Sequence, residues 1–177
     1  KNHILSNKTK EAKKLIDKAE LILKSYPESD YYIEFNDLQA SYYLANSQLD
    51  SARIAIDKGL KLSEKLKFDP FVPSLYKQLH HYYMRVNKYG DALTSLQIVI
   101  DSQLYPNLNE EANNAKLMSL VYEKLNNHHL AYNWAKKSLQ LKDSLYNLNL
   151  SKEISNLEGE FRFSEKEKEI LKLQSEK

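Results

Sequence analysis

A tyrosine and an alanine nine residues apart recur three times along this chain. The pairs return after 40 and then 39 residues, and they are Tyr43 with Ala52, Tyr83 with Ala92, and Tyr122 with Ala131. Self-similarity at such a period indicates stacked helical units, because one unit cannot bury its own apolar face and must pack on its neighbours. Ala12 lies 40 residues before Ala52 and indicates the remnant of an earlier unit.

Each tyrosine–alanine pair spans a predicted turn between two antiparallel helices. A large ring on one helix and a methyl group on the next allow the two helices to approach closely and interlock. In the second unit we expect Asn87 and Gly90 to adopt the left-handed backbone that ends a helix, and Asp91 to cap the following helix. The prolines lie outside these turns, where they can end one unit and begin the next: Pro27, Pro70, Pro73 and Pro106.

Apolar residues recur at steps of three and four along the chain, which predicts helices and no strands. With only three glycines, the sequence offers no Gly-rich linker between separate domains. The fold class predicted is therefore all-α. We expect helices over 9–25, 29–46, 49–66, 73–87, 90–103, 108–126 and 128–142, followed by a long helix from 144.

The pattern resembles the tetratricopeptide repeat (TPR). With the tyrosine as the eleventh residue of its unit, the three units begin near Ile33, Pro73 and Ala112. Gln39 and His80 depart from the family pattern, and the period exceeds the usual length of about 34 residues. The resemblance implies an α-solenoid of antiparallel helix hairpins wound into a right-handed superhelix. It divides the chain into a repeat domain with a partial first repeat over 1–143 and a C-terminal capping or coiled-coil helix over 144–177.

The composition excludes several classes of partner. Basic residues number 26 and acidic residues 24, mixed along the chain, so no sustained basic face is predicted for nucleic acid. There is no cysteine, which excludes disulfides and thiol chemistry. No apolar run approaches the ~20 residues that span a bilayer, so we expect no direct membrane contact. Because the chain begins at Lys1, within a repeat, we interpret it as a piece of a longer protein.

Residues that could carry metal or catalytic chemistry are few. The pairs His80-His81 and His128-His129 are adjacent in sequence, and adjacent helical residues point about 100° apart, so neither pair readily chelates one ion. The chain has no Gly-rich phosphate loop, and no serine lies in a nucleophile-elbow motif. We therefore expect no metal site, no cofactor and no catalytic residues.

The TPR resemblance implies that peptides or extended protein segments bind along the inner surface formed by the first helix of each unit. Such a groove is acidic at one end and basic toward the other, which orients a bound segment by charge-assisted hydrogen bonds. A solvated face whose charges only maintain solubility is the alternative. The inward positions carried over are Glu34, Asp37 and Ser41 in the first unit, Lys77, Gln78, His81 and Arg85 in the second, and Asn113, Lys116 and Leu120 in the third.

The predicted terminal helix carries an apolar stripe at steps of four, three and four residues, which is typical of a coiled-coil seam. Two interpretations compete: a cap laid over the last repeat, and a rod that pairs with another helix. We expect the helix to mediate self-association as a homodimer, at least in a longer parent protein. The stripe consists of Leu150, Ile154, Leu157 and Phe161.

The segment Leu-Lys-Asp-Ser-Leu at 141–145, followed by a Lys/Glu-rich helix with the triplet Lys-Glu-Ile, resembles a group of bacterial signalling proteins. In these proteins a repeat array leads through a coiled coil into a histidine kinase or a DNA-binding domain. The resemblance implies a non-catalytic sensory or protein-interaction region, with the periplasm favoured over the cytoplasm as its location. A free-standing cytoplasmic adaptor that binds a peptide is the alternative, and a hydrolase is a remote one.

Overall fold

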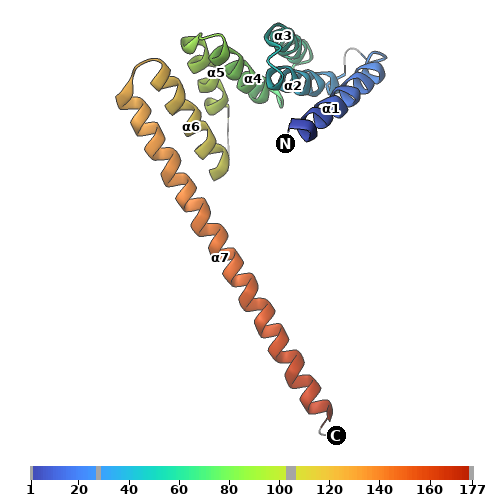
Figure 1. Cartoon of the computed structure of the whole chain (residues 1–177), viewed down its shortest axis with the longest axis vertical. Coiled ribbons are helices and arrows are strands. Elements are labelled where there is room, and N and C mark those ends of the chain that lie inside the picture. The colour runs from blue at the N-terminus through green and yellow to red at the C-terminus, as the bar shows by residue number, and fades with distance from the viewer. Residues whose placement is uncertain (1, 27–28, 103–106, 176–177) are drawn as a thin grey trace.

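A computed structural model describes residues 2–26, 29–102 and 107–175 of the chain, with side chains between residues 10 and 168. These residues form helices and no strand, which confirms the all-helical prediction for this part of the chain. Figure 1 shows the helices in a curved body from which the last helix projects. The helices are α1 (Asn2–Leu23), α2 (Tyr31–Ala45), α3 (Leu49–Leu66), α4 (Val72–Arg85), α5 (Tyr89–Asp101), α6 (Leu108–Lys124) and α7 (His128–Ser175).

Three helix pairs, α2 with α3, α4 with α5 and α6 with α7, are joined by the same backbone turn. Four residues after the tyrosine, the backbone enters the left-handed region, with φ of 58–59° at Ser47, Asn87 and Asn126. The next backbone N–H then donates to the tyrosine carbonyl, from Gln48, Lys88 and Asn127 at 2.8–2.9 Å. This is the Schellman arrangement, which satisfies carbonyls that the end of a helix leaves without partners.

The second helix of each pair begins immediately after this turn. In the third pair, the side chain of Asn127 accepts a hydrogen bond from the Leu130 N–H at 3.1 Å and so caps α7. Asn87 takes the predicted left-handed conformation, but the prediction for Gly90 is wrong, because Gly90 lies inside α5 and has no positive φ. Asp91 does not cap α5 either, since it lies within the first turn of that helix.

The first and second helices of a pair meet at the small residue nine positions after the tyrosine. Ala92 is fully buried there, and its carbonyl lies 3.0 Å from Nδ1 of His80. In the third pair the hydroxyl of Ser119, three residues before the tyrosine like His80, donates to the Ala131 carbonyl at 2.9 Å. His80, which departs from the family pattern, therefore makes a polar contact between the two helices of its pair.

Successive pairs are packed together less evenly than an ideal repeat requires. The first helix of pair one, α2, contacts both α3 and α4, whereas α6 rests mainly on α5 and α7. One buried cluster, Ala40, Ala55, Ile56 and Leu79, joins α2, α3 and α4. A second, Leu96, Val99 and Met118, joins α5 and α6.

A polar network also ties pair one to pair two. Arg53 on α3 donates from Nη1 to the hydroxyl of Tyr83 on α4 at 2.9 Å, and its Nε contacts both carboxylate oxygens of Asp57. The guanidinium carbon also lies 5.5 Å from the centre of the Tyr83 ring. Hydrogen bonds to Asp57 and Tyr83 stabilise the charged form and raise the pKa of Arg53, so the tie is always ionised.

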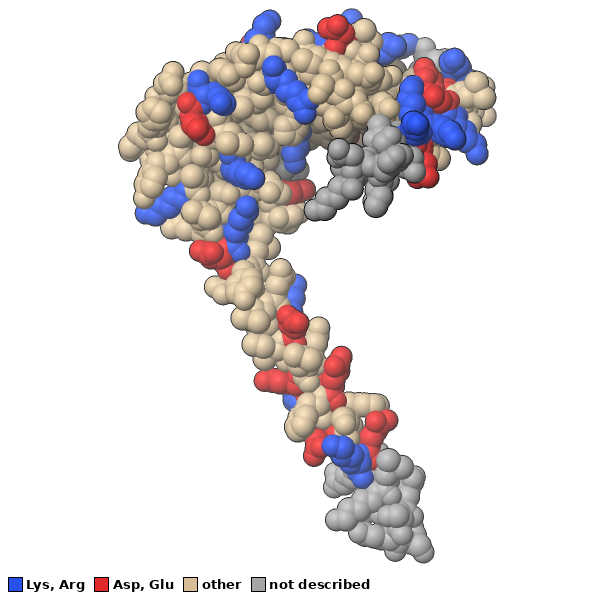
Figure 2. All heavy atoms as spheres, in the orientation of Figure 1, with Lys and Arg blue, Asp and Glu red and all other residues tan. Residues whose placement is uncertain are grey.

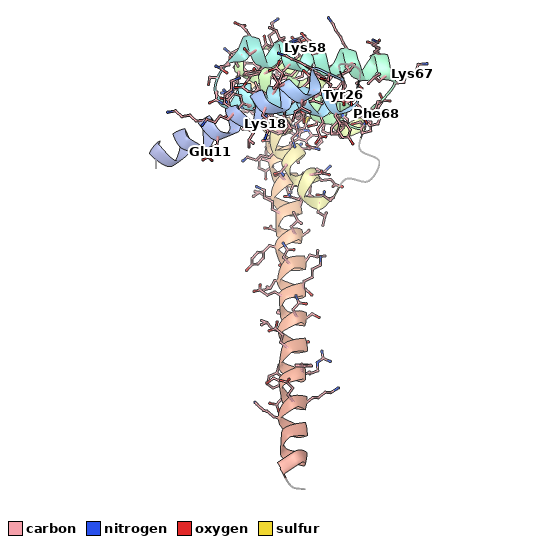
Figure 3. All side chains as sticks on the ribbon, turned by 90° about the vertical axis from the view of Figure 1, so that its right-hand side faces the viewer. Glu11, Lys18, Tyr26, Lys58, Lys67 and Phe68 are labelled. Carbon is pink, nitrogen blue, oxygen red and sulfur yellow. The ribbon has the colours of Figure 1, made fainter. Side chains whose placement is uncertain are left out.

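The last helix differs from the prediction. A break between 128–142 and a helix from 144 was expected, but α7 is one continuous helix of 48 residues. The segment between them contains neither glycine nor proline, so nothing in it ends a helix. Leu145 is partly covered, and residues 146–168 are all exposed, so α7 does not turn back over the last pair. Figure 3 shows its side chains radiating from the projecting part without a neighbouring helix.

The contact at Ala92 gives a first prediction. Replacing Ala92 with Leu adds three carbons at a fully buried meeting point of α4 and α5, so we expect a loss of about 1–3 kcal/mol in the free energy of unfolding. Urea denaturation measures the change. Thr94→Leu, at an exposed position on the same helix, is the control and leaves the midpoint nearly unaltered. Equal midpoints for the two variants would contradict the packing described here.

Gly59 gives a second prediction, because it lies where α3 meets α2 and α4. A Cβ atom on Gly59 would lie 2.9 Å from both Cδ atoms of Leu75 and 3.3 Å from Cβ of Asn36. Both neighbours are buried, so we expect Gly59→Ala to destabilise the protein by about 1–3 kcal/mol through overpacking. Gly90→Ala is the matched control, since a Cβ there meets nothing within 4 Å. It should be neutral or gain up to about 1 kcal/mol from helix propensity.

Candidate protein-interaction groove

A groove of about 320 Å³ lies between α2 and α4, where the first two pairs meet. We call it the α2–α4 groove. Its walls combine apolar side chains with groups that can donate hydrogen bonds. They are Ser41, Leu44 and Ala45 from α2, and Gln78, His81, Met84 and Arg85 from α4.

The repeat explains why these residues meet. Ser41 and His81 each lie two residues before the tyrosine of their unit, and Leu44 and Met84 each lie one residue after it. Positions three residues apart share one face of an α-helix, so both helices present the same two positions to the groove. The groove is therefore formed from equivalent positions on two successive first helices.

His81 is neutral in this groove at physiological pH. Burial is the main cause that lowers its pKa to about 4, and the nearby His80, Lys77 and Arg85 contribute to this shift in the same direction. Its ring packs edge-on against His80, with centroids 5.2 Å apart. A neutral imidazole offers one donor and one acceptor, so His81 can accept a proton when a carboxylate approaches.

Arg85 marks the basic rim of the groove. Its Nη1 donates to the hydroxyl of Ser47 in the first turn at 3.1 Å, which fixes the guanidinium beside the α2–α4 groove. An arginine has five N–H donors in a planar fork, so this single bond leaves donors for a ligand carboxylate. Together with Lys77, whose charge acts on His81, it gives the groove a positive potential.

Asp37, one of the predicted inner-surface residues, makes a hydrogen bond between two helices. Its Oδ2 accepts a hydrogen bond from the hydroxyl of Ser74 on α4 at 2.7 Å. Its Oδ1 is buried and has no partner among the described residues. Asp37 thus ties α2 to α4 and is not one of the residues that line the groove.

The structure brings four of the ten predicted inner-surface residues into one groove: Ser41, Gln78, His81 and Arg85. Lys77 is half-buried beside it, and Glu34 is exposed on α2 outside it. The predicted residues of the third unit are also exposed, but α6 rests on α5, so they do not extend the α2–α4 groove. These are Asn113, Lys116 and Leu120. The sequence analysis did not predict the apolar members Leu44, Ala45 and Met84. The repeat offered a signal for two of them, because Leu44 and Met84 occupy equivalent positions in their units.

Two other properties bear on the chemistry that this part of the chain can perform. Among the described residues there is no group of three or more His, Cys, Asp or Glu side chains that could hold a metal ion. Within the same residues, no helix combines the length and the apolar character that a membrane span needs.

Comparison with known proteins returned no match: no family model, no curated protein and no solved structure is similar to this chain.

The buried histidines give a third prediction, on pH and stability. The pKa of His81 in the folded chain lies below its ordinary value of 6.5, so the unfolded chain binds protons first as the pH falls. Stability is therefore full above about pH 6.5 and falls as the pH drops toward 4; the lowered pKa of His80 acts in the same direction. His81→Gln should reduce the loss of Tm between pH 7 and pH 5. His129→Gln, at an exposed position in α7, is the control and should leave that loss unaltered.

Proposed function

We propose that this chain is a TPR-like, right-handed α-solenoid that acts as a non-catalytic protein-interaction region. Its ligand is an extended peptide segment that carries a carboxylate and binds in the α2–α4 groove. The repeated turn after Tyr43, Tyr83 and Tyr122 supports the solenoid, because helix pairs that share one internal turn are units of the same geometry, as a regular superhelix requires.

The composition of the groove is the observation that carries the proposal. Leu44 and Met84 provide an apolar contact for a side chain, and Met adapts readily to ligands of different shape. Arg85 and Lys77 provide the positive charge, while His81 is held neutral between them. Burial is the main cause of the lowered pKa of His81, and repulsion from the nearby cations adds to it. A carboxylate bound beside His81 offsets that repulsion, so binding and protonation favour one another.

The wider proposal is that the region belongs to a bacterial signal-transduction protein, as its sensory or interaction part. The support is architectural: α7 begins as the second helix of the last pair and continues far beyond the body as one rod. A partner bound to the body is thereby connected mechanically to whatever α7 contacts. A cytoplasmic adaptor, the alternative, is favoured if α7 proves dispensable for function; in either case the chain itself performs no catalysis.

The fourth prediction tests the groove. Lys77→Glu with Arg85→Glu should weaken binding of a short synthetic peptide of alternating Leu and Glu by about tenfold or more, because two attractive charges become repulsive. Isothermal titration calorimetry gives the affinity, and circular dichroism checks that helicity is retained. The matched control is Lys58→Glu with Lys61→Glu, an equal charge change at exposed positions on α3.

Two further measurements define the ligand. The same peptide with Gln in place of Glu should bind the unmodified chain more weakly, because the carboxylate is lost. In NMR titrations the pKa of His81 should rise when the Glu peptide is bound. Full binding by the Lys77/Arg85 variant would place the interaction outside the α2–α4 groove and remove the support for this function.

A further inference from the structure

An apolar stripe runs down the side of α7 that faces away from α6. Its seven side chains are 41–67% exposed, although each is large and hydrophobic. At a rise of about 1.5 Å per residue, the stripe is roughly 43 Å long. We call it the outer stripe of α7, and it consists of Tyr132, Leu139, Tyr146, Leu150, Ile154, Leu157 and Phe161.

The upper end of this stripe corresponds to a surface that is covered in the first two pairs. In pair one, Arg53 lies ten residues after Tyr43 and contacts Tyr83 of the following pair. At the same position in pair two, Leu93 packs with Tyr122 on the cluster between α5 and α6. In pair three this position is Tyr132, which is 65% exposed, and no helix of the described residues packs on that face of α7.

The position seven residues later repeats the pattern. Leu60 and Ile100 are partly buried against the two core clusters, whereas their equivalent Leu139 is 63% exposed. The outer stripe therefore starts on the surface where α3 receives α4 and α5 receives α6. A helix is the element that this surface accepts elsewhere in the same chain.

The lower end of the stripe forms a heptad seam with acidic borders. Leu150 and Leu157 occupy d positions, and Ile154 and Phe161 occupy a positions. The positions that border such a seam, e and g, set the choice of partner by charge. Between residues 150 and 165, four of these positions are glutamates, all exposed: Glu153, Glu158, Glu160 and Glu165. Figure 2 shows acidic side chains along this projecting part of α7.

Basic side chains of the same helix do not neutralise the charge of these glutamates. At about 100° per residue, Lys152 and Lys166 lie on the opposite side of α7 from the seam. Arg162 lies 3.9 Å from Glu158, and Lys168 lies 3.1 Å from Glu165, but all four side chains are more than half exposed. Exposed pairs of this kind are weak, so the glutamates can exchange them for cations on a partner.

A second copy of this chain fits the seam poorly. In a parallel pair of helices, each g residue faces the e residue of the next heptad on the other chain. Glu153 would then face Glu158, and Glu160 would face Glu165, twice each by symmetry. An antiparallel pair would also place glutamates opposite glutamates. Four apolar side chains form only a short seam, so this repulsion opposes the self-association that the apolar spacing alone predicts.

We propose that the outer stripe of α7 binds an amphipathic helix of a different protein, with apolar a and d positions bordered by Lys or Arg. Such a helix continues the packing that α4 and α6 provide in the earlier pairs, and its cations meet the four glutamates. This site is separate from the α2–α4 groove, because the groove is lined by α2 and α4 and the stripe lies on α7.

The experiment uses the whole chain and two synthetic helical peptides of four heptads. Both have Ile at a and Leu at d; one has Lys at every e and g position and the other has Glu. Calorimetry should show the Lys peptide binding about tenfold or more tightly than the Glu peptide, with a difference that shrinks at high salt. Changing Glu153, Glu158, Glu160 and Glu165 together to Lys should reverse the preference.

A matched pair of variants locates the site on α7. Phe161→Asp should abolish binding of the Lys peptide, whereas Phe163→Asp, equally exposed but about 200° further round the helix, should leave it unaltered. Equal effects of the two variants, equal affinity for the two peptides, or no binding of either peptide would each overturn the proposal.

Sedimentation equilibrium tests whether a second copy of this chain binds the outer stripe instead. We expect the unmodified chain and the four-lysine variant each to be monomeric alone and to form a heterodimer when mixed, because only the mixture places opposite charges along the seam. A dimer of the unmodified chain at neutral pH, independent of salt, would overturn the proposal and assign the stripe to a second copy.

Discussion

The left-handed backbone at Ser47, Asn87 and Asn126 is the constraint on which the architecture depends. It turns the chain within two residues and returns an N–H to the tyrosine carbonyl, so the next helix starts at a fixed distance and angle. Because the turn is identical in all three pairs, equivalent positions of the first and second helices face each other within every pair. The buried alanines, the His80 contact and the groove residues all follow from that register.

The tyrosine–alanine period was sufficient to predict helix pairs and their turns, because a fixed spacing reports a repeated backbone geometry. Which residue adopts the left-handed conformation was only partly predictable. Ser47 adopts it although serine has no special preference for it, whereas Gly90 does not adopt it although glycine favours it. The inner surface was predicted as one groove over three units. Contact between first helices depends on side-chain shape, which no period encodes, and α6 rests on α5 rather than continuing the surface of α4.

The α2–α4 groove shows how packing and chemistry share the same residues. His80 serves the contact within its pair, and its neighbour His81 faces the groove one residue later on the same helix. Burial keeps His81 neutral, and the closeness of His80, 5.2 Å between ring centres, and the two cations nearby act in the same direction. Asp37 is hydrogen-bonded to Ser74 and is not among the residues that line the groove. The positive potential is therefore a consequence of how α2 and α4 are held together.

A helix as long as α7 can stand clear of the body because its nucleation cost is met where it packs on α6. Beyond that contact, each added residue needs only to propagate an existing helix, and pairs such as Glu158 with Arg162 favour this by a few tenths of a kcal/mol each. The rod holds its distal side chains at fixed angles to the last pair. A helix bound along the outer stripe would touch both the last pair and the rod, so it would be held at a fixed angle to the body.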